Sequence, residues 1–217
     1  MVITEEAKIR DQHIGKFFNS QGNGEPKSPD FDKLPASAKL HIKSFKDANV
    51  ENSVDVGCGA GDILLGLQET GIKMVYGVDL SPKSITMAKL RIEKFGKIDN
   101  AEFYEGSFVD MDSIQAESVS YHKTLCCHPD LELMLNQAIN MNTRIIAITV
   151  PRRRIFVKLG LTICSGLLKI IRNKYRPHLH REEKIDSILS NSGYMKTVTK
   201  KYRIWQTSIY EKNLKST

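Results

Sequence analysis

A glycine-rich turn directly after an apolar segment restricts the fold of this chain more than any other feature. The stretch VDVGCGAGD, residues 54–62, follows a segment typical of a buried strand and leads into GDILLGLQET, where a helix is predicted. Gly57, Gly59 and Gly61 permit a tight turn and let the backbone approach a ligand closely. The turn indicates a nucleotide-like ligand, and the rest of the chain must indicate which one.

Segments with strand character alternate with helical patterns along most of the chain. After the glycine turn, strands are predicted in KMVYGVD, AEFYEGS, VSYHKTL and RIIAITV, with helices between most of them. Parallel strands need crossover helices, so the alternation predicts a doubly wound, mostly parallel α/β sheet with helices on both faces. The tail MKTVTKKYRIWQTSIYE is β-rich and should complete a Rossmann-like, seven-stranded sheet as an antiparallel hairpin.

The helix predicted in SPKSITMAKLRIEKFG carries its own start and stop signals. Ser81 suits the N-cap, Pro82 suits the first helical position, and Gly96 can end the helix. The residues of its apolar face are Ile85, Ala88, Ile92 and Phe95.

The domain organisation is predicted as one main domain with two additions. Residues 1–49 are expected to form an N-terminal helical lid, and residues 50–213 the main domain. A helical basic insert is expected at about 152–181, with its long helix over residues 152–173. The loop FFNSQGNGEPKSPDF, residues 17–31, is expected to cover the ligand from the other side.

The charge of the chain is concentrated in that insert. The formal net charge is +7, and residues 152–181 contain nine Lys or Arg and no Asp or Glu. A basic surface attracts phosphates, carboxylates, nucleic acid or anionic lipid by the same physics, and a merely solvated helix surface is the alternative.

Segments that would place the chain in a membrane or an oxidising compartment are missing from the sequence. No run reaches about 18 uninterrupted apolar residues, and the first residues lack the apolar run of a signal peptide. The four cysteines are few, and two of them, Cys126 and Cys127, are adjacent, which disfavours a disulfide framework and a metal site. We therefore expect a cytoplasmic protein without a metal.

Glycine spacing and nearby acids distinguish between the candidate cofactors. The dinucleotide pattern G-x-G-x-x-G would need a glycine at position 62, where this chain has Asp62. An acid at a helix N-terminus repels a pyrophosphate, whereas Asp55 and Asp62 would favour a ligand that bears a sulfonium and an ammonium. Asp79 ends the second strand, eighteen residues beyond Gly61, and can accept hydrogen bonds from both ribose hydroxyls.

These motifs resemble those of the class I S-adenosylmethionine-dependent methyltransferases. DVGCGAG is similar to their first motif and YGVDLS to their second, and the resemblance covers roughly residues 50–213. TLCCHPDLELML, ITVPRRRIFVKLGL, YRPHLH and WQTSIYEK narrow it to a small-molecule branch distantly similar to magnesium-protoporphyrin O-methyltransferases. The third motif of the family often ends in an acid, whereas EGSF has Ser107 at that place.

The resemblance implies a cofactor and a set of contacts. It implies S-adenosyl-L-methionine as methyl donor, with S-adenosyl-L-homocysteine as the product. The expected cofactor-binding residues are Asp55, Gly57, Cys58, Gly59, Gly61, Asp79, Leu80, Ser107, Phe108 and Thr124.

Catalytic residues are harder to identify, because methyl transfer from a sulfonium mainly requires alignment and exclusion of water. His128, just past the fourth strand, is the best-placed base or substrate contact, with a capping or surface role as the alternative. His180, in RPHLH, is the second candidate, with an ordinary solvated loop as the alternative. His122 lies within a strand and is expected to be a packed side chain.

The sequence thus predicts a methyltransferase that acts on a small or medium organic acceptor, anionic and apolar in character. An RNA methyltransferase that uses the basic segment 152–181 and a non-catalytic S-adenosylmethionine-binding module are the alternatives. The apolar helix after Pro151 could pack in the core, form a lid over an apolar pocket, or lie on an anionic membrane as a peripheral contact. The sequence leaves the oligomeric state open.

Overall fold

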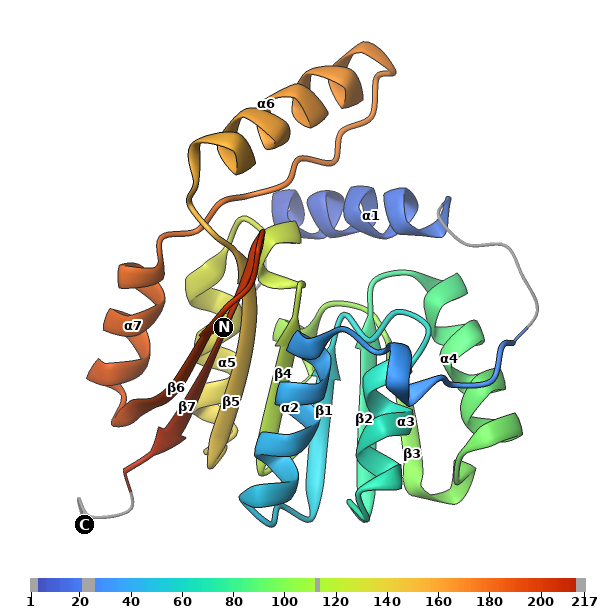
Figure 1. Ribbon diagram of the computed structural model, residues 1–217. Helices are drawn as coiled ribbons and strands as arrows, with labels where there is room; N and C mark the ends of the chain where they lie inside the picture. Colours follow the sequence, from blue (N-terminus) through green and yellow to red (C-terminus); the bar gives the residue numbers. More distant parts are fainter. Residues whose placement is uncertain (1–3, 21–25, 112–113, 214–217) are drawn as a thin grey trace.

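A seven-stranded sheet forms the centre of the molecule. The computed structural model describes residues 4–20, 26–111 and 114–213 of the 217-residue chain. The strands follow the order β3-β2-β1-β4-β5-β7-β6 across the sheet (Figure 1). They are β1 (Asn52–Val56), β2 (Met74–Asp79), β3 (Ala101–Glu105), β4 (Ser118–His122), β5 (Ile145–Pro151), β6 (Tyr194–Lys201) and β7 (Trp205–Lys212).

The direction of the strands agrees with the sequence pattern. β1 to β5 are parallel, and β7 pairs antiparallel with both β5 and β6. The predicted Rossmann-like sheet, mostly parallel with a C-terminal antiparallel hairpin, is therefore confirmed.

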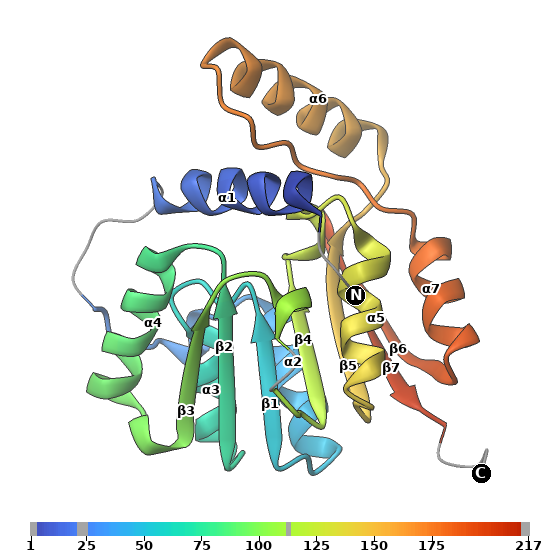
Figure 2. The same ribbon diagram turned by 180° about the vertical axis from the view of Figure 1, so that it is seen from behind.

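Helices cover both faces of the sheet, as Figures 1 and 2 show. α2, α3 and α4 pack on one face through a core that contains Phe45, Leu64 and Ile92, whereas α5 and α7 pack on the other through Leu135 and Ile185. The helices are α1 (Glu5–Asn19), α2 (Ala36–Asp47), α3 (Asp62–Glu69), α4 (Pro82–Phe95), α5 (Leu131–Asn140), α6 (Ile155–Ile170) and α7 (Glu182–Asn191). Short 3-10 turns in the described ranges are η1 (Phe31–Lys33), η2 (Ile98–Asn100), η3 (Phe108–Asp110) and η4 (Leu125–Cys127).

The boundaries of α4 confirm the predicted caps. The Ser81 side chain accepts the backbone N–H of Ser84, Pro82 is the first helical residue, and Gly96 follows the last one. Of the predicted apolar face, Ala88 and Ile92 are fully buried.

α6 begins three residues later than predicted. Arg152 still follows the sheet, because its backbone N–H donates to the carbonyl of Ile204 at 2.7 Å. The helix can start only after this bond, and it ends before Arg172, which adopts a positive φ of 55°. No helix within the described ranges has the length and apolar content needed to cross a membrane.

α1 lies across the carboxyl ends of the parallel strands rather than on a face of the sheet (Figure 2). Gly15 permits this close approach, because a Cβ there would lie 2.3 Å from the backbone oxygen of Leu80. One turn further along, at the last residue of α1, the Asn19 side chain accepts the Ser81 hydroxyl at 2.7 Å. α2, also within the predicted lid segment 1–49, packs on the sheet instead, and residues 21–25 of the predicted covering loop lie outside the described residues.

Candidate active site

A cavity of about 260 Å³ lies at the carboxyl edge of the sheet, beneath α1. Ile14 and Phe18 of α1 form part of its lining. Most of the rest comes from the last residues of β1, β2 and β4 and from the turns that follow β1 to β4, with Ser84 of α4 and Met134 of α5. The predicted site residues that line it are Gly57, Gly59, Asp79, Leu80, Ser107, Phe108, Thr124 and His128. Its volume is near the lower end of the range typical of small-molecule sites, about 300–1,000 Å³.

The three glycines of the turn are required for different structural reasons. Gly57, Gly59 and Gly61 all adopt positive φ, at 71°, 54° and 81°. A Cβ at Gly57 would lie 2.5 Å from the hydroxyl of Thr124, and one at Gly61 would touch Ala88 of α4. A Cβ at Gly59 would meet no atom within 4 Å, so this glycine leaves open space beside the cavity for a ligand.

Asp79 at the end of β2 is held by backbone amides. Its Oδ2 accepts the N–H of Gly59 at 2.9 Å, and its Oδ1 accepts the N–H of Ser81 at 2.8 Å. Burial raises the pKa of Asp79, and these two bonds act against that rise. Each carboxylate oxygen has a second lone pair, so Asp79 can still accept hydrogen bonds from two vicinal hydroxyls.

Asp55 and Cys58 are buried beneath the turn and do not belong to the cavity lining. Successive strand side chains point to opposite faces, so Asp55 points away from the face that Val56 occupies. Burial raises the pKa of Asp55 to about 7, against a hydrogen bond with Ser120 that lowers it. Its Oδ1 has no hydrogen-bond partner among the described residues.

A row of polar side chains continues from Asp55 across this face of the sheet. His41 of α2 bonds to Ser120 at 3.0 Å through Nδ1 and to Thr149 at 2.8 Å through Nε2. Burial holds the pKa of His41 well below its usual value, so the ring is neutral. The hydroxyl of Thr149 also bonds to that of Thr207 at 2.8 Å.

Asp62 does not face the cavity, contrary to the expectation that its charge bears on the ligand. It forms an ion pair with Arg91 of α4, with 2.7 Å between Oδ1 and Nη1. Arg91 is buried and also donates to the backbone oxygens of Ala60 and Lys27. Asp62 therefore joins α3 to α4, and Asp79 is the carboxylate that lines the cavity.

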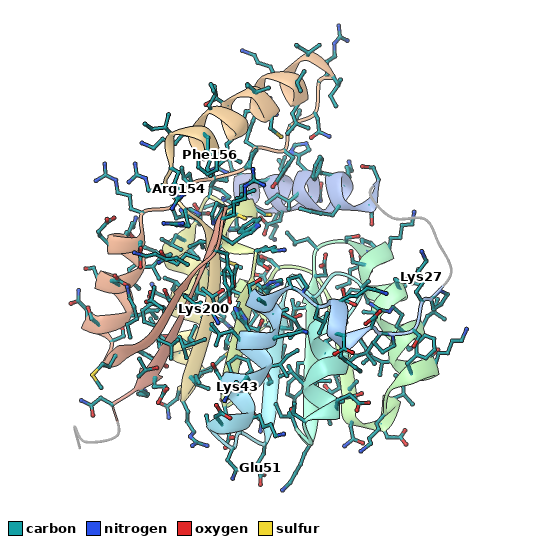
Figure 3. All side chains as sticks on the ribbon, in the orientation of Figure 1. Lys27, Lys43, Glu51, Arg154, Phe156 and Lys200 are labelled. Carbon is teal, nitrogen blue, oxygen red and sulfur yellow. The ribbon has the colours of Figure 1, made fainter. Side chains whose placement is uncertain are left out.

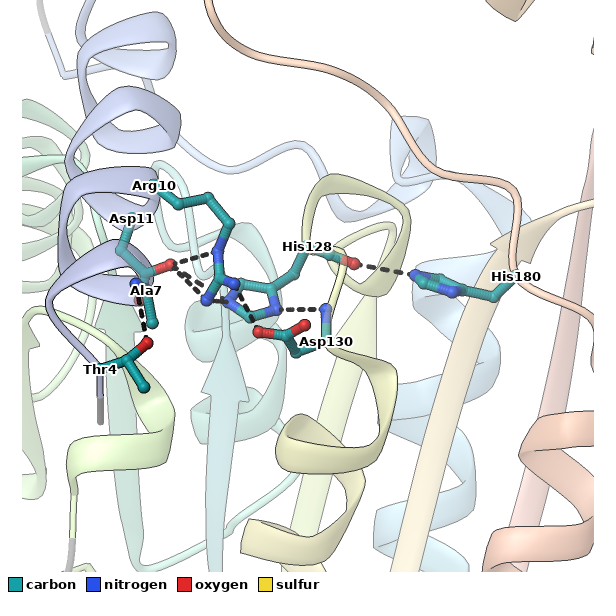
Figure 4. Close-up of polar contacts among 7 residues, drawn as sticks. All are labelled: Thr4, Ala7, Arg10, Asp11, His128, Asp130 and His180. Atoms are coloured by element: carbon teal, nitrogen blue, oxygen red, sulfur yellow. Dashed lines mark hydrogen bonds and ion pairs between the residues drawn. The ribbon is translucent and has the colours of Figure 1, made fainter. Parts of the chain in front are cut away.

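A polar cluster fastens α1 to the turn after β4 (Figure 4). His128 is 4% exposed, and its Nε2 lies 3.2 Å from Oδ1 of Asp11. Arg10 forms ion pairs with Asp11 at 3.2 Å and with Asp130 at 2.5 Å. Burial opposes the charge of Asp11, but the hydrogen bonds with His128 and Ser107 and the nearby positive charge outweigh it and lower its pKa.

Both ring nitrogens of His128 are engaged. Its Nδ1 accepts the backbone N–H of Asp130 at 3.2 Å. In the neutral ring the proton then resides on Nε2, which donates it to Asp11. His128 lines the cavity, but in this arrangement neither nitrogen is free to take a proton from an acceptor.

His180 lies outside the cavity lining. Its Nε2 approaches the backbone oxygens of Leu125 and His128 at 2.9 and 2.8 Å. Since carbonyl oxygens only accept, this nitrogen donates, and it ties the segment before α7 to η4. His178 stacks on His180, and its own backbone N–H donates to Cys126.

Two residues at the end of β4 belong to the site although the sequence did not indicate them. His122, expected to be a packed side chain, is half-buried, lines the cavity and bonds to Ser37 at 2.9 Å. Burial and the charge of Lys123 lower the pKa of His122 to about 4. Lys123 also lines the cavity and has a φ of 63°, which is rare outside glycine and is not readable from the residue type.

A second groove of about 290 Å³ borders the cavity and shares Ile14 and Cys127 with it. It lies between α1 and the segment before α7. Its basic and imidazole lining residues are Arg10, His13, Lys174, Arg176 and His178. Glu6 also lines the groove and Arg10 is paired with two carboxylates, so Lys174 and Arg176 supply the positive charge beside the cavity.

Solved structures similar to this chain share its fold at low sequence identity. The magnesium protoporphyrin IX methyltransferase from Synechocystis PCC 6803 with bound SAH is 18% identical, with a TM-score of 0.70 over 94% of this chain and 100% of that one. An O-methyltransferase family protein from Burkholderia thailandensis is 13% identical, with a TM-score of 0.65 over 81% of this chain and 55% of that one. At these identities the likeness concerns the fold.

Curated relatives match over shorter stretches. The small RNA 2'-O-methyltransferase of Arabidopsis thaliana is 33% identical over 79 residues, which are 33% of this chain and 8% of that protein. The ribosomal protein L11 methyltransferase of Clostridium botulinum (strain Eklund 17B / Type B) is 35% identical over 65 residues, 30% of this chain and 20% of that protein. The aligned part is thus a minor share of each of these relatives.

A family model described as a methyltransferase domain matches residues 48–175. This range is more than half of the 217 residues and contains the glycine turn, Asp79 and His128. The chain therefore belongs to the methyltransferase domain family.

Proposed function

We propose that the chain transfers a methyl group from S-adenosylmethionine to a small or medium organic acceptor that is apolar and anionic. One observation carries the proposal. A single cavity brings together the turn of Gly57 and Gly59, the carboxylate of Asp79 and the end of β4, beneath the helix α1. Membership in the methyltransferase domain family supports the same conclusion.

The lining residues fit the parts of this cofactor. The open space at Gly59 suits a ligand that lies against the turn, and Asp79 suits the ribose hydroxyls. Leu80 and Phe108 add apolar surface for the adenine, and Ser107 stands where an acid is common in the family. Asp55 acts from beneath the turn, as a buried carboxyl whose ionised form would be favoured by a nearby cation.

Methyl transfer from a sulfonium requires little acid or base catalysis by the residues of the chain. When bound, S-adenosylmethionine supplies a methyl group that its sulfonium has already activated. The residues of the chain align the acceptor and exclude water. Ile14 and Phe18 provide the apolar roof, and His128 and His180 act as positioning residues, because they hold α1 and η4 in place.

The charges around the cavity favour an acceptor that arrives ionised. Lys123 lines the cavity, and the adjoining groove adds Lys174 and Arg176. His122 is neutral at physiological pH, and a pKa of about 4 makes it a weak base. An ionised oxygen nucleophile needs no base, and these cations would hold it near the methyl donor.

RNA is the second candidate acceptor. The nine cations of residues 152–181 suit phosphates, and the small RNA 2'-O-methyltransferase of Arabidopsis thaliana is similar over part of the chain. Retention on heparin and an RNA affinity that falls steeply with salt would favour this candidate. An affinity for RNA that does not depend on salt, or no affinity at all, would remove it.

Two glycines provide a matched test of the cofactor site. Gly59 and Gly71 both adopt positive φ, and a Cβ at either position would meet no atom within 4 Å. Gly59→Ala and Gly71→Ala therefore carry similar backbone strain, but only Gly59 lines the cavity. Isothermal titration with S-adenosylmethionine should show binding that Gly59→Ala weakens at least about tenfold, or roughly 1.4 kcal/mol, and that Gly71→Ala preserves.

Failure of the wild-type chain to bind millimolar S-adenosylmethionine would refute the proposal, and so would an equal loss in both variants. The acceptor is then identified with a methyl-labelled donor and a metabolite extract, with mass spectrometry of the labelled product. Label in an organic anion supports the proposed acceptor class, and label in the RNA fraction supports the second candidate. Binding with no release of S-adenosylhomocysteine in any fraction would identify a non-catalytic binding module.

A further inference from the structure

α6 has two apolar faces, of which only one is packed. Val157 and Leu168 are buried against the rest of the molecule, and Leu161 is half-buried between them. The other face is open to solvent, although the residues on it are large and apolar. Their exposed fractions are Ile155 87%, Phe156 49%, Leu159 59%, Ile163 55%, Leu167 60% and Ile170 77%.

The open residues form one stripe. Ile155, Leu159, Ile163 and Leu167 recur every fourth position, which places them along one side of a helix. With Ile171, this segment supplies seven of the twelve large apolar side chains that are exposed in the described part of the chain. A contiguous apolar patch of this kind marks an interaction surface, whereas isolated exposed apolar residues do not.

Positive charge borders the stripe. Lys158 and Lys169 lie on α6 itself, on a polar strip that also contains Thr162. The cations of residues 152–154 precede the helix, and Figure 3 shows Arg154 and Phe156 at the start of α6. No acidic residue occurs between positions 152 and 181.

We propose that α6 lies flat in the surface of an anionic lipid bilayer, with its open stripe among the acyl chains and its cations at the headgroups. The surface of an anionic bilayer binds helices that have apolar residues on one side and Lys or Arg beside them. A second copy of this chain would bring like charges together, and the charged phosphate backbone of RNA offers no apolar surface for the stripe. At 16 residues α6 is shorter than the roughly 20 residues that cross a bilayer, which fits a helix that lies in the interface.

Binding to vesicles tests this surface directly. The full chain is mixed with vesicles of phosphatidylcholine alone or of phosphatidylcholine with phosphatidylglycerol, and the bound fraction is measured by flotation. We expect binding to the anionic vesicles at least about tenfold above that to the neutral ones, falling as salt screens the cations.

A triple variant distinguishes binding through the stripe from nonspecific adsorption through other exposed apolar residues. Leu159→Ser, Ile163→Ser and Leu167→Ser together should lower binding to anionic vesicles at least about tenfold, since each removes an apolar side chain from the lipid. The matched control changes Met195 and Ile204 to Ser, which are 60% and 42% exposed but lie on the hairpin. All five side chains are exposed, and circular dichroism confirms that each variant keeps the fold.

Three results would overturn the proposal. The first is equal binding to neutral and anionic vesicles, and the second is an equal loss in the triple variant and the control. The third is a concentration-dependent dimer in lipid-free sedimentation that the triple variant abolishes, which would assign the stripe to a second copy. S-adenosylmethionine binding is measured on the same variants and should be unchanged. The membrane proposal is thus tested independently of the proposed function.

Discussion

Replacement of Asp55 by Asn should change how the stability of the protein depends on pH. The carboxyl is fully buried at the end of β1, and its pKa is raised to about 7 in the folded chain, against about 3.9 in an unfolded chain. A raised folded pKa means that the stabilising contribution is complete below about pH 3.9 and is lost as the pH rises through about 7. The amide introduced by Asp55→Asn would resemble the protonated acid at every pH.

The size of the effect follows from that difference in pKa. About three pKa units correspond to about 4 kcal/mol of unfolding free energy in total, of which about 2.5 kcal/mol is lost between pH 5 and pH 8. Buried His41 works in the opposite direction, because its lowered pKa costs stability as the pH falls. The comparison of wild type and Asp55→Asn cancels that contribution.

Urea unfolding at pH 5 and pH 8 is the assay. Relative to wild type, Asp55→Asn should gain about 2.5 kcal/mol on going from pH 5 to pH 8. Asp99→Asn, at an exposed carboxylate, is the control and should show no such gain. If the stability difference between Asp55→Asn and wild type is the same at both pH values within about 0.5 kcal/mol, the account of a buried, proton-binding Asp55 is wrong.

Three further outcomes are expected. A cation bound near Asp55 would lower its pKa, so S-adenosylmethionine binding near pH 7 should release protons, seen by titration in buffers of different ionisation enthalpy and absent in Asp55→Asn. Asp11→Ala removes the carboxylate that accepts from His128 and should lower the unfolding free energy by about 1–3 kcal/mol, with faster hydrogen exchange in α1; unchanged exchange would contradict a role in holding that helix. Lys123→Met should raise the KM of an anionic acceptor about tenfold and leave kcat nearly unchanged, whereas Lys200→Met on β6 should alter neither.

Local sequence patterns predicted the strands, the helices and the glycine turn, because the conformation of each depends mainly on residues that are neighbours in the sequence. The caps of α4 are read from Ser81, Pro82 and Gly96, and the cavity takes Gly57 and Gly59 from one turn. The signals failed where a partner comes from far along the chain. Asp62 pairs with Arg91, and His128 bonds to Asp11 at a separation of 117 residues, and neither pattern is periodic or local.

Strand alternation could have corrected one expectation. In β1 the side chains of Val54 and Val56 share one face, so Asp55 must occupy the other, where α2 covers it. An interpretation of residues 54–62 as one acidic turn misses this alternation. The exposed stripe of α6 could not have been predicted in the same way, because an apolar helix usually indicates burial, and only the structure leaves one face open.

The roof of the cavity connects the proposed cofactor site to α6. Ile14 of α1, Leu168 of α6 and Tyr175 form one small apolar cluster, and the ring of Tyr175 stacks on Phe17 with centroids 4.2 Å apart. Because α1 lies over the cavity, a movement of this roof would widen the path by which a ligand enters. Such a movement disturbs three buried side chains and the ion pairs of Arg10, but it leaves both cores of the sheet intact. Since Leu168 belongs to the same helix as the exposed stripe, any surface that holds α6 also bears on α1, the helix that lies over the cavity.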